Sequence, residues 1–149
     1  MSSLIDPPVD DTYRSLGYAL KRAQQALRGH LDTELRNIGL TTPQYSVLAG
    51  LEVSAGLSSA ELARRAFVTP QTMQSIIATL ERDGLIKRMA HPVHGRVLTT
   101  ELTPDGRSAL RAAHEIVANA EGLVRNAVAP DDPEIIYSAL LRIAEAMRD

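Results

Sequence analysis

The chain has no cysteine, no tryptophan and a single phenylalanine among its 149 residues. Without cysteine, the protein can form no disulfide and has no thiol for catalysis or redox sensing. With so few aromatic residues, the core must consist of Leu, Ile, Val and Ala, as in small helical proteins. No apolar run approaches the roughly 20 residues that a membrane-spanning helix needs. We therefore expect a cytoplasmic protein with no membrane segment.

The amino-terminal segment, residues 1–10, has neither a basic start nor an apolar stretch. It does not resemble a signal peptide, and we expect a short disordered lead. Apolar residues make up 44% of the chain, which argues against wholesale disorder. The length is sufficient for one compact domain with a sizeable core.

Charge is distributed unevenly along the chain. The net charge of −2 gives no general affinity for nucleic acid. Between Arg64 and Arg96, however, six basic and two acidic residues give a net charge of +4, so the rest of the chain carries −6. A basic stretch within an acidic chain is consistent with a polyanion-binding patch, and equally with chance clustering.

A long helix is predicted near the amino terminus. Asp10 or Asp11 can cap this helix, which runs to about Ile38 and ends at Gly39. Its apolar residues recur at spacings of three, four or multiples of these, which is the helical pattern. They are Leu16, Leu20, Ala23, Leu27, Leu31 and Ile38.

Two further helices are predicted at the carboxyl end. Thr103 caps the first, with Pro104 in its first turn, and Pro130 breaks it. Asp132 then caps the last helix. In a monomer, the apolar stripes of these helices and of the first long helix would form a large exposed patch. The three outer helices therefore predict a dimer.

Three short helices are predicted between the long ones. Thr42–Pro43 and Thr69–Pro70 each supply a cap and a first-turn proline. Ser58 and Glu61 have the spacing of a capping box. Gly84 is well placed to end the third short helix.

The segment after Gly84 changes to a strand-like pattern. The β-rich runs "LIKRM" and "RVLTTEL" enclose "AHPVHG", a turn with Pro and Gly, which together predict a two-stranded hairpin. The expected fold is mainly α with a small β-hairpin wing, a winged helix-turn-helix flanked by long helices. We assign residues 40–103 to a DNA-binding region, and residues 11–38 with 104–149 to a dimerisation region of the same compact domain.

The helix over residues 70–82 carries an unusual polar face, because its polar residues are uncharged. They are Gln71, Thr72, Gln74, Ser75 and Thr79. In a helix-turn-helix the second helix enters the major groove, where base edges present neutral donors and acceptors that Gln, Ser and Thr can pair. Carboxylates would be repelled there by phosphate. The alternative is a helix exposed to water, and the capped helix before it and the hairpin after it favour DNA readout.

Basic residues flank this helix on both sides. Arg64 and Arg65 lie where the preceding helix could contact phosphates, contacts that fix position but carry no sequence information. For each of them singly, an ordinary solvated side chain is the alternative. Lys87 and Arg88 lie on the first strand, and Arg96 at the hairpin tip could enter a narrow minor groove.

At these residues the chain resembles the MarR family of transcriptional regulators, which are dimeric bacterial repressors. The resemblance lies in "LTTPQYSVLAGL" (40–51), "SSAELARRAFVTPQTMQSIIATLERDGLIKR" (58–88) and "GRVLTTELTPDGRSAL" (95–110). It implies a homodimer built from the first helix and the last two, with pseudo-palindromic double-stranded DNA as the partner. The helix over 70–82 would enter the major groove and the wing over 87–100 would lie near the minor groove. The candidate DNA-binding residues are Ser58, Arg64, Thr69, Gln71, Thr72, Gln74, Ser75, Thr79, Lys87, Arg88, His94 and Arg96.

The resemblance also implies a small ligand, often a phenol or aromatic acid, that loosens DNA binding. The residues that would border its cavity are Tyr18, His30, Tyr45, Leu48 and His114. Core-edge or solvated positions are the alternative for each of them. The sequence names neither the ligand nor the operator.

Two histidines mark a departure from the family pattern. His94 stands where the family usually has an aspartate that steadies the wing arginine, and His91 stands where the family often has another. Protonated His94 cannot do so, which suggests a pH-sensitive wing. The two histidines could share a metal ion, but a site needs about four ligands and no carboxylate is near in sequence. We predict neither metal nor cofactor.

Phe67 is a second departure, since the turn before the 70–82 helix often has a small residue. Packing of Phe67 into the core would account for it.

Other classes of protein fit less well. No nucleophile–base pair, phosphate loop or paired carboxylates indicate an enzyme. A winged-helix module that binds proteins, or a ligand-independent DNA-binding protein, remains as an alternative.

Overall fold

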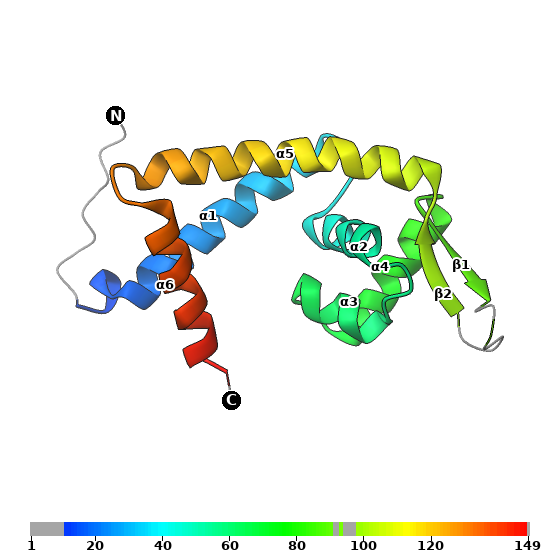
Figure 1. Ribbon diagram of the computed structural model, residues 1–149, viewed down its shortest axis with the longest axis horizontal. Coiled ribbons are helices and arrows are strands. Elements are labelled where there is room, and N and C mark those ends of the chain that lie inside the picture. Colours follow the sequence, from blue (N-terminus) through cyan, green and yellow to red (C-terminus); the bar gives the residue numbers. More distant parts are fainter. Residues whose placement is uncertain (1–10, 91–92, 94–97, 149) are drawn as a thin grey trace.

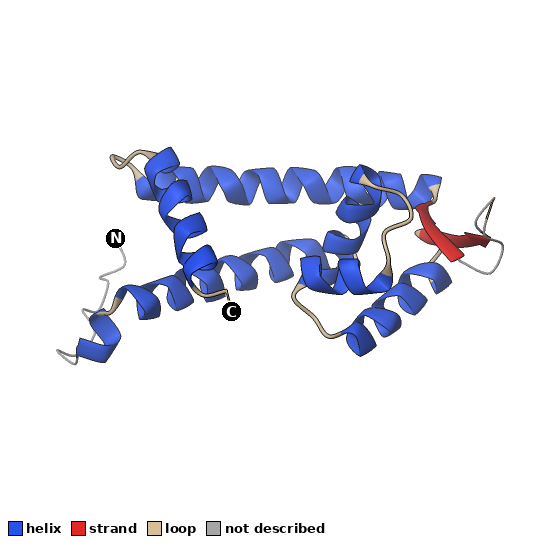
Figure 2. Ribbon diagram, turned by 60° about the horizontal axis from the view of Figure 1, so that its bottom comes forward, coloured by secondary structure: helices blue, strands red, loops and turns tan. Residues whose placement is uncertain are grey.

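The structure, a computed structural model, describes residues 11–90, 93 and 98–148. The predicted lead over residues 1–10 lies outside the described residues. The protein is mainly α with one β-hairpin, as the sequence predicts (Figure 1). A winged helix-turn-helix lies at one end of a long helix, α5, and the last helix, α6, lies at its other end (Figures 1 and 2).

The winged helix-turn-helix consists of three helices and a hairpin. These elements are α2 (Thr42–Val53), α3 (Ser59–Ala66), α4 (Pro70–Arg82), β1 (Ile86–Ala90) and β2 (Leu98–Leu102). The strands pair antiparallel, with Ile86 opposite Leu102 and Ala90 opposite Leu98. Helix α2 packs on α5, whereas α3 and α4 lie on the far side of α2 (Figure 1).

The outer elements surround α5 (Pro104–Val128), which is about 37 Å long at 1.5 Å per residue. They are η1, a single 3-10 turn (Asp11–Arg14), α1 (Leu16–Arg36) and α6 (Pro133–Ala146). Helix α1 packs against α5, and the two lie side by side in both views (Figures 1 and 2). Among the described residues, no helix is both long and apolar enough to cross a bilayer.

The first long helix is shorter than predicted. Ser15 caps α1, instead of Asp10 or Asp11, by accepting a hydrogen bond from the Tyr18 amide at 3.1 Å. Ser15 is the better cap because the apolar pattern begins at the very next residue, and Asp11 falls in the separate turn η1. At the other end, a turn with Gly39 at a φ of 79° follows the helix.

Each of the helices α2 to α6 also begins with a side-chain cap, in most cases at the predicted residue. Ser58, Thr69, Thr103 and Asp132 each accept a hydrogen bond from an amide in the first turn of the next helix. The cap of α2 is Thr41 and not Thr42, because Thr41 forms a reciprocal capping box with Gln44 that shifts the helix start by one residue.

A single core joins the winged helix-turn-helix to the outer helices. Its fully buried members come from α1, α2, α3, α4, β1 and α5. They include Leu35, Val47, Leu48, Leu62, Met73, Ile77, Leu80, Ile86 and Leu110. On α4, Met73, Ile77 and Leu80 are buried in this core, and Ile76 is partly buried at its edge.

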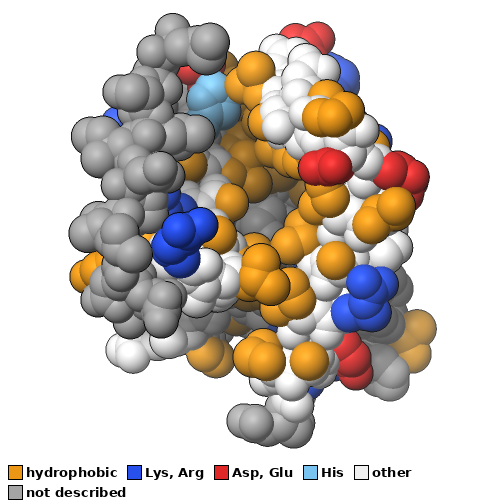
Figure 3. Space-filling model, turned by 90° about the vertical axis from the view of Figure 1, so that its left-hand side faces the viewer, with side chains coloured by type: hydrophobic (Ala, Val, Ile, Leu, Met, Phe, Trp, Pro, Cys, Tyr) orange, Lys and Arg blue, Asp and Glu red, His pale blue; other side chains and the backbone are white. Residues whose placement is uncertain are grey.

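The outer helices leave their apolar stripes exposed. No residue of α6 is buried, and this helix hardly touches any other element. Exposed apolar side chains on α1, α5 and α6 include Leu16, Leu20, Leu27, Leu123, Val124, Ile135, Leu140, Leu141 and Ile143. Figure 3 shows apolar side chains gathered around a hollow at the end of the molecule where α6 lies.

Candidate nucleic-acid interface and effector pocket

Helix α4 presents its uncharged polar residues to solvent. Gln71, Thr72, Gln74 and Ser75 are exposed, and Thr79 is half-buried. On the opposite side, Met73, Ile77 and Leu80 are buried in the core and fix the helix on the domain. The face that the sequence singled out is therefore free to meet another molecule.

The caps at the starts of α3 and α4 engage three of the candidate DNA-binding residues, Ser58, Thr69 and Thr72. The Ser58 hydroxyl accepts from the Glu61 amide at 3.2 Å and donates to the Glu61 carboxylate at 3.3 Å. The Thr69 hydroxyl accepts from the Thr72 amide at 3.1 Å and donates to the Thr72 hydroxyl at 3.0 Å. Both hydroxyls thus orient the helix starts, and the Thr72 hydroxyl hydrogen remains available to donate.

The candidate cations take different orientations. Arg64 is exposed in the last turn of α3. Lys87 and Arg88 point to opposite faces of the hairpin, because neighbouring residues of a strand alternate. Lys87 is exposed and stands opposite Glu101, whereas Arg88 is half-buried opposite Thr100. The remaining wing candidates, His94 and Arg96, lie outside the described residues, as does His91.

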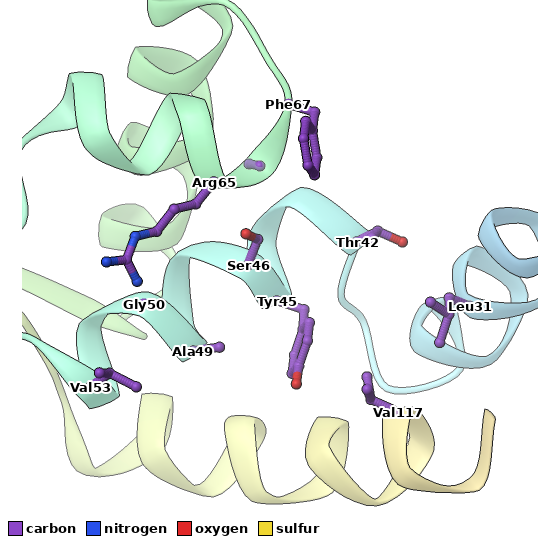
Figure 4. A pocket seen from close by; sticks show the side chains of 11 residues that line it. Leu31, Thr42, Tyr45, Ser46, Ala49, Gly50, Val53, Arg65, Phe67 and Val117 are labelled. Atoms are coloured by element: carbon purple, nitrogen blue, oxygen red, sulfur yellow. The ribbon is translucent and has the colours of Figure 1, made fainter. Parts of the chain in front are cut away.

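An apolar pocket lies between the winged helix-turn-helix and the outer helices (Figure 4). Its volume is about 420 Å³, within the range of small-molecule sites. Helices α1, α2, α3 and α5 all contribute to its lining. The lining residues are Leu31, Thr42, Tyr45, Ser46, Ala49, Gly50, Val53, Arg65, Ala66, Phe67 and Val117.

Tyr45 joins this pocket to α5. Its ring lines the pocket and its hydroxyl points towards α5 (Figure 4), where it lies 3.0 Å from His114 Nδ1. His114 Nε2 lies 3.0 Å from the Glu52 carboxylate. Burial, and to a lesser extent the negative charge of Glu52, raises the pKa of Tyr45 above its ordinary value. The Tyr45 hydroxyl therefore stays protonated at neutral pH.

The structure does not gather all five predicted pocket residues. Tyr45 and His114 are in contact, but Tyr18 lies near the start of α1, where its ring meets that of Tyr13 edge to face. His30 is exposed on α1 and lines a separate, smaller pocket of about 280 Å³ together with Asn119 and other residues. Leu48 has no exposed surface: it lies in the core and is not among the residues that line the pocket.

Glu52, Arg65 and Phe67 were not among the predicted pocket residues, although Glu52 contacts His114 and the other two line the pocket. Glu52 completes the contact with His114, although no local pattern could reveal a pair 62 residues apart. Arg65 lines the pocket, and its side chain runs from α3 towards Gly50 on α2 (Figure 4). It has no ionic partner in the part of the chain that the structure describes.

Phe67 is the third of these residues, and the expectation that it packs into the core was wrong. Its side chain is 94% exposed at the edge of the pocket. Phe67 ends α3 in the left-handed conformation, with a φ of 57°, which turns its side chain away from the core.

No group of three or more His, Asp or Glu residues is arranged to hold a metal ion within residues 11–90, 93 and 98–148. The pair His91 and His94 falls outside this part of the chain.

Known proteins of similar sequence and structure support one family. A sequence profile of the MarR family matches residues 38–97. The HTH-type transcriptional repressor Rv2887 of Mycobacterium tuberculosis is 42% identical over 109 residues, which cover 73% of this chain and 78% of that protein.

Two solved structures have the same fold. Rv2887 in complex with p-aminosalicylic acid matches with a TM-score of 0.73 and 35% identity, over 87% of this chain and 98% of that one. The transcriptional repressor CouR bound to a 23-mer DNA duplex matches with a TM-score of 0.79 and 30% identity, over 90% and 95%. With its winged helix-turn-helix between long outer helices, the chain belongs to the MarR family of transcriptional regulators.

Proposed function

We propose that the protein is a homodimeric transcriptional repressor that binds a pseudo-palindromic operator and is released by a small aromatic or phenolic ligand. The observation that carries this proposal is the exposed uncharged face of α4. The similar proteins are named as repressors, and CouR is described as bound to DNA. The family is one of regulators and not a class of enzymes. Because operator DNA lies in the cytoplasm of a bacterium, cytoplasmic location belongs to the same proposal.

The proposed readout uses α4 in the major groove. Gln71 and Gln74 can each form two hydrogen bonds with adenine, and Thr72 and Ser75 can pair with donors or acceptors. Arg64 at the end of α3 would contact phosphate and fix the position of α4 on the duplex. The hairpin, with Lys87 on its solvent face, would lie beside the minor groove.

The proposed dimer uses the exposed apolar stripes of α1, α5 and α6. An isolated subunit would expose these stripes to water, and α6 would have almost no contacts. A second copy of the chain covers such a face in a two-fold arrangement. A two-fold dimer can also present two α4 helices about one DNA turn apart, roughly 34 Å.

The proposed ligand occupies the pocket between α2 and the outer helices. Its lining is mainly apolar, and its polar residues include Arg65, Ser46 and Thr42. This chemistry suits a flat apolar molecule with one negatively charged group. The relative Rv2887 has been solved in complex with p-aminosalicylic acid, which is a flat aromatic acid.

Selection of bound duplexes from a random pool tests the proposed function. The expected result is an inverted repeat whose half-sites lie about 10 base pairs apart, centre to centre. Affinity for the selected duplex should fall roughly 10³- to 10⁵-fold between about 50 and about 200 mM salt, if six to ten phosphates are contacted. If no duplex is enriched, or if the affinity for DNA does not depend on the salt concentration, a winged-helix module that binds proteins would be favoured.

A further inference from the structure

We propose that Tyr45, His114 and Glu52 form a relay through which a ligand in the pocket controls DNA binding. This inference rests on the proposed function, and it names the contact that connects the pocket to the orientation of the winged helix-turn-helix. The relay is defined as the two hydrogen bonds that join these three side chains.

For a neutral His114 ring, the partners in the relay assign the hydrogen positions. The Glu52 carboxylate can only accept, so His114 Nε2 carries the hydrogen of that 3.0 Å contact. In the neutral ring, Nδ1 is then an acceptor, and the Tyr45 hydroxyl donates to it over 3.0 Å. The two rings meet edge to face, with centroids 5.5 Å apart and planes at 89°. Each polar atom therefore has a defined role, and each side chain holds the next in place.

The relay clamps α2 onto α5 at two points. Tyr45 and Glu52 lie seven residues apart on α2, about two helical turns, and His114 on α5 lies between them. Helix α2 packs against α3, α4 and β2, so it carries the winged helix-turn-helix with it. Helix α5 continues to the face proposed for the dimer. The clamp thus sets the angle of α4 relative to the second α4 of the dimer.

A ligand in the pocket acts directly on one end of this clamp. The Tyr45 ring forms part of the pocket wall while its hydroxyl holds His114 (Figure 4). A ligand that displaces the ring breaks the bond to His114 and frees α2 to turn on α5. A ligand can shift such an equilibrium only through different contacts in the two states, and the Tyr45 ring supplies that difference.

The test compares DNA affinity with and without saturating p-aminosalicylic acid, using the selected duplex. Calorimetry on each variant establishes the concentration of p-aminosalicylic acid that saturates the protein. We expect the probe to weaken DNA binding by the wild type by roughly 5- to 150-fold, the usual size of coupling between two sites. In Tyr45→Phe, which lacks the hydroxyl but keeps the ring, the weakening factor should fall close to one.

A second pair of variants guards against loss of folding. Glu52 is partly exposed and does not line the pocket. Glu52→Leu removes the acceptor that orients His114 and should reduce the weakening factor, whereas Glu52→Gln keeps an acceptor and should restore it. Tyr13→Phe removes a hydroxyl from η1, outside the pocket and the relay, and keeps the ring that meets Tyr18, so it serves as the matched control with wild-type coupling.

The outcomes separate the relay from the proposed function. Wild-type coupling in Tyr45→Phe and in Glu52→Leu would overturn the relay while the ligand-controlled repressor stands. DNA binding by the wild type that the probe does not weaken would overturn the proposed ligand control, and the relay with it.

Discussion

Gly106 shows how one residue can fix the junction between the hairpin and α5. A Cβ atom at this position would lie 2.0 Å from the carbonyl oxygen of Leu85, which is a backbone atom. The same oxygen accepts the Thr103 amide at 3.1 Å, so it cannot move without losing that bond. Only glycine allows the first turn of α5 to approach the chain after α4 this closely.

Gly106→Ala should therefore lower the free energy of unfolding by roughly 1–3 kcal/mol, the cost of forcing extra atoms into a packed site. Denaturant unfolding monitored by circular dichroism measures it. Gly122→Ala is the control on the same helix, because a Cβ there meets nothing within 4 Å. It should be neutral or stabilising by up to about 1 kcal/mol. Equal effects at the two positions would contradict this account.

The raised pKa of Tyr45 leads us to expect a loss of stability at alkaline pH. Its folded-state pKa is raised above 10.0, so the unfolded chain loses this proton first as the pH rises. The contribution of the neutral hydroxyl is complete below pH 10.0 and is lost as the pH rises through the folded-state pKa. The melting temperature of the wild type should thus fall more steeply above pH 10 than that of Tyr45→Phe. If the melting temperatures of the two proteins fall in parallel, the pKa of Tyr45 is not raised in the folded state.

At the scale of elements, the caps of the helices were the most predictable feature. A Ser, Thr or Asp before a helical pattern offers a hydroxyl or carboxylate to free amides whatever the rest of the chain does. Ser58, Thr69 and Thr103 could therefore be identified from sequence alone. The start of α2 was missed by one residue, because Thr41 and Thr42 are equivalent until the partner of Gln44 is known.

Contacts between distant elements could not be predicted in this way. Glu52 and His114 meet only because α2 packs on α5, and neither position carries a local signal. Phe67 was expected in the core because it is apolar, but its left-handed backbone turns it outward. The outer face of α4 was predicted because a helix has a fixed period, so the buried positions determine the exposed ones.

The cap of α4 predicts a linked change in stability and DNA affinity. Thr69→Ala removes the acceptor for the Thr72 amide and should lower the free energy of unfolding by about 1 kcal/mol. Affinity for the selected duplex should fall as well, because the first turn of α4 carries Gln71 and Thr72. Thr69→Ser keeps the hydroxyl and should restore both. A stability loss in Thr69→Ser equal to that of Thr69→Ala would exclude the cap as the cause.

At the scale of the whole molecule, the proposed dimer depends on α6 together with α1 and α5. Its apolar stripe has almost no contacts within the subunit. Burying a charge in an apolar interface is costly. A charge on this stripe should therefore separate a dimer without disturbing the winged helix-turn-helix.

Leu140→Lys should accordingly convert the protein to a monomer at micromolar concentration, as measured by sedimentation or light scattering. Its affinity for the selected inverted repeat should fall as well, because each half-site is then bound separately. Ser138→Lys places the same charge on the other side of α6 and should leave the dimer intact. A wild type that is already monomeric would refute the proposed assembly.

The proposed function depends on the recognition of DNA bases by the neutral face of α4. The most direct test is the affinity of Gln71→Glu/Gln74→Glu for the selected duplex and for an unrelated duplex. Both side chains are exposed, so the fold and the dimer should be unchanged. We predict that the preference for the selected duplex disappears, with a loss of roughly 5- to 150-fold for each glutamine. An undiminished preference in the folded double variant would contradict the proposed function.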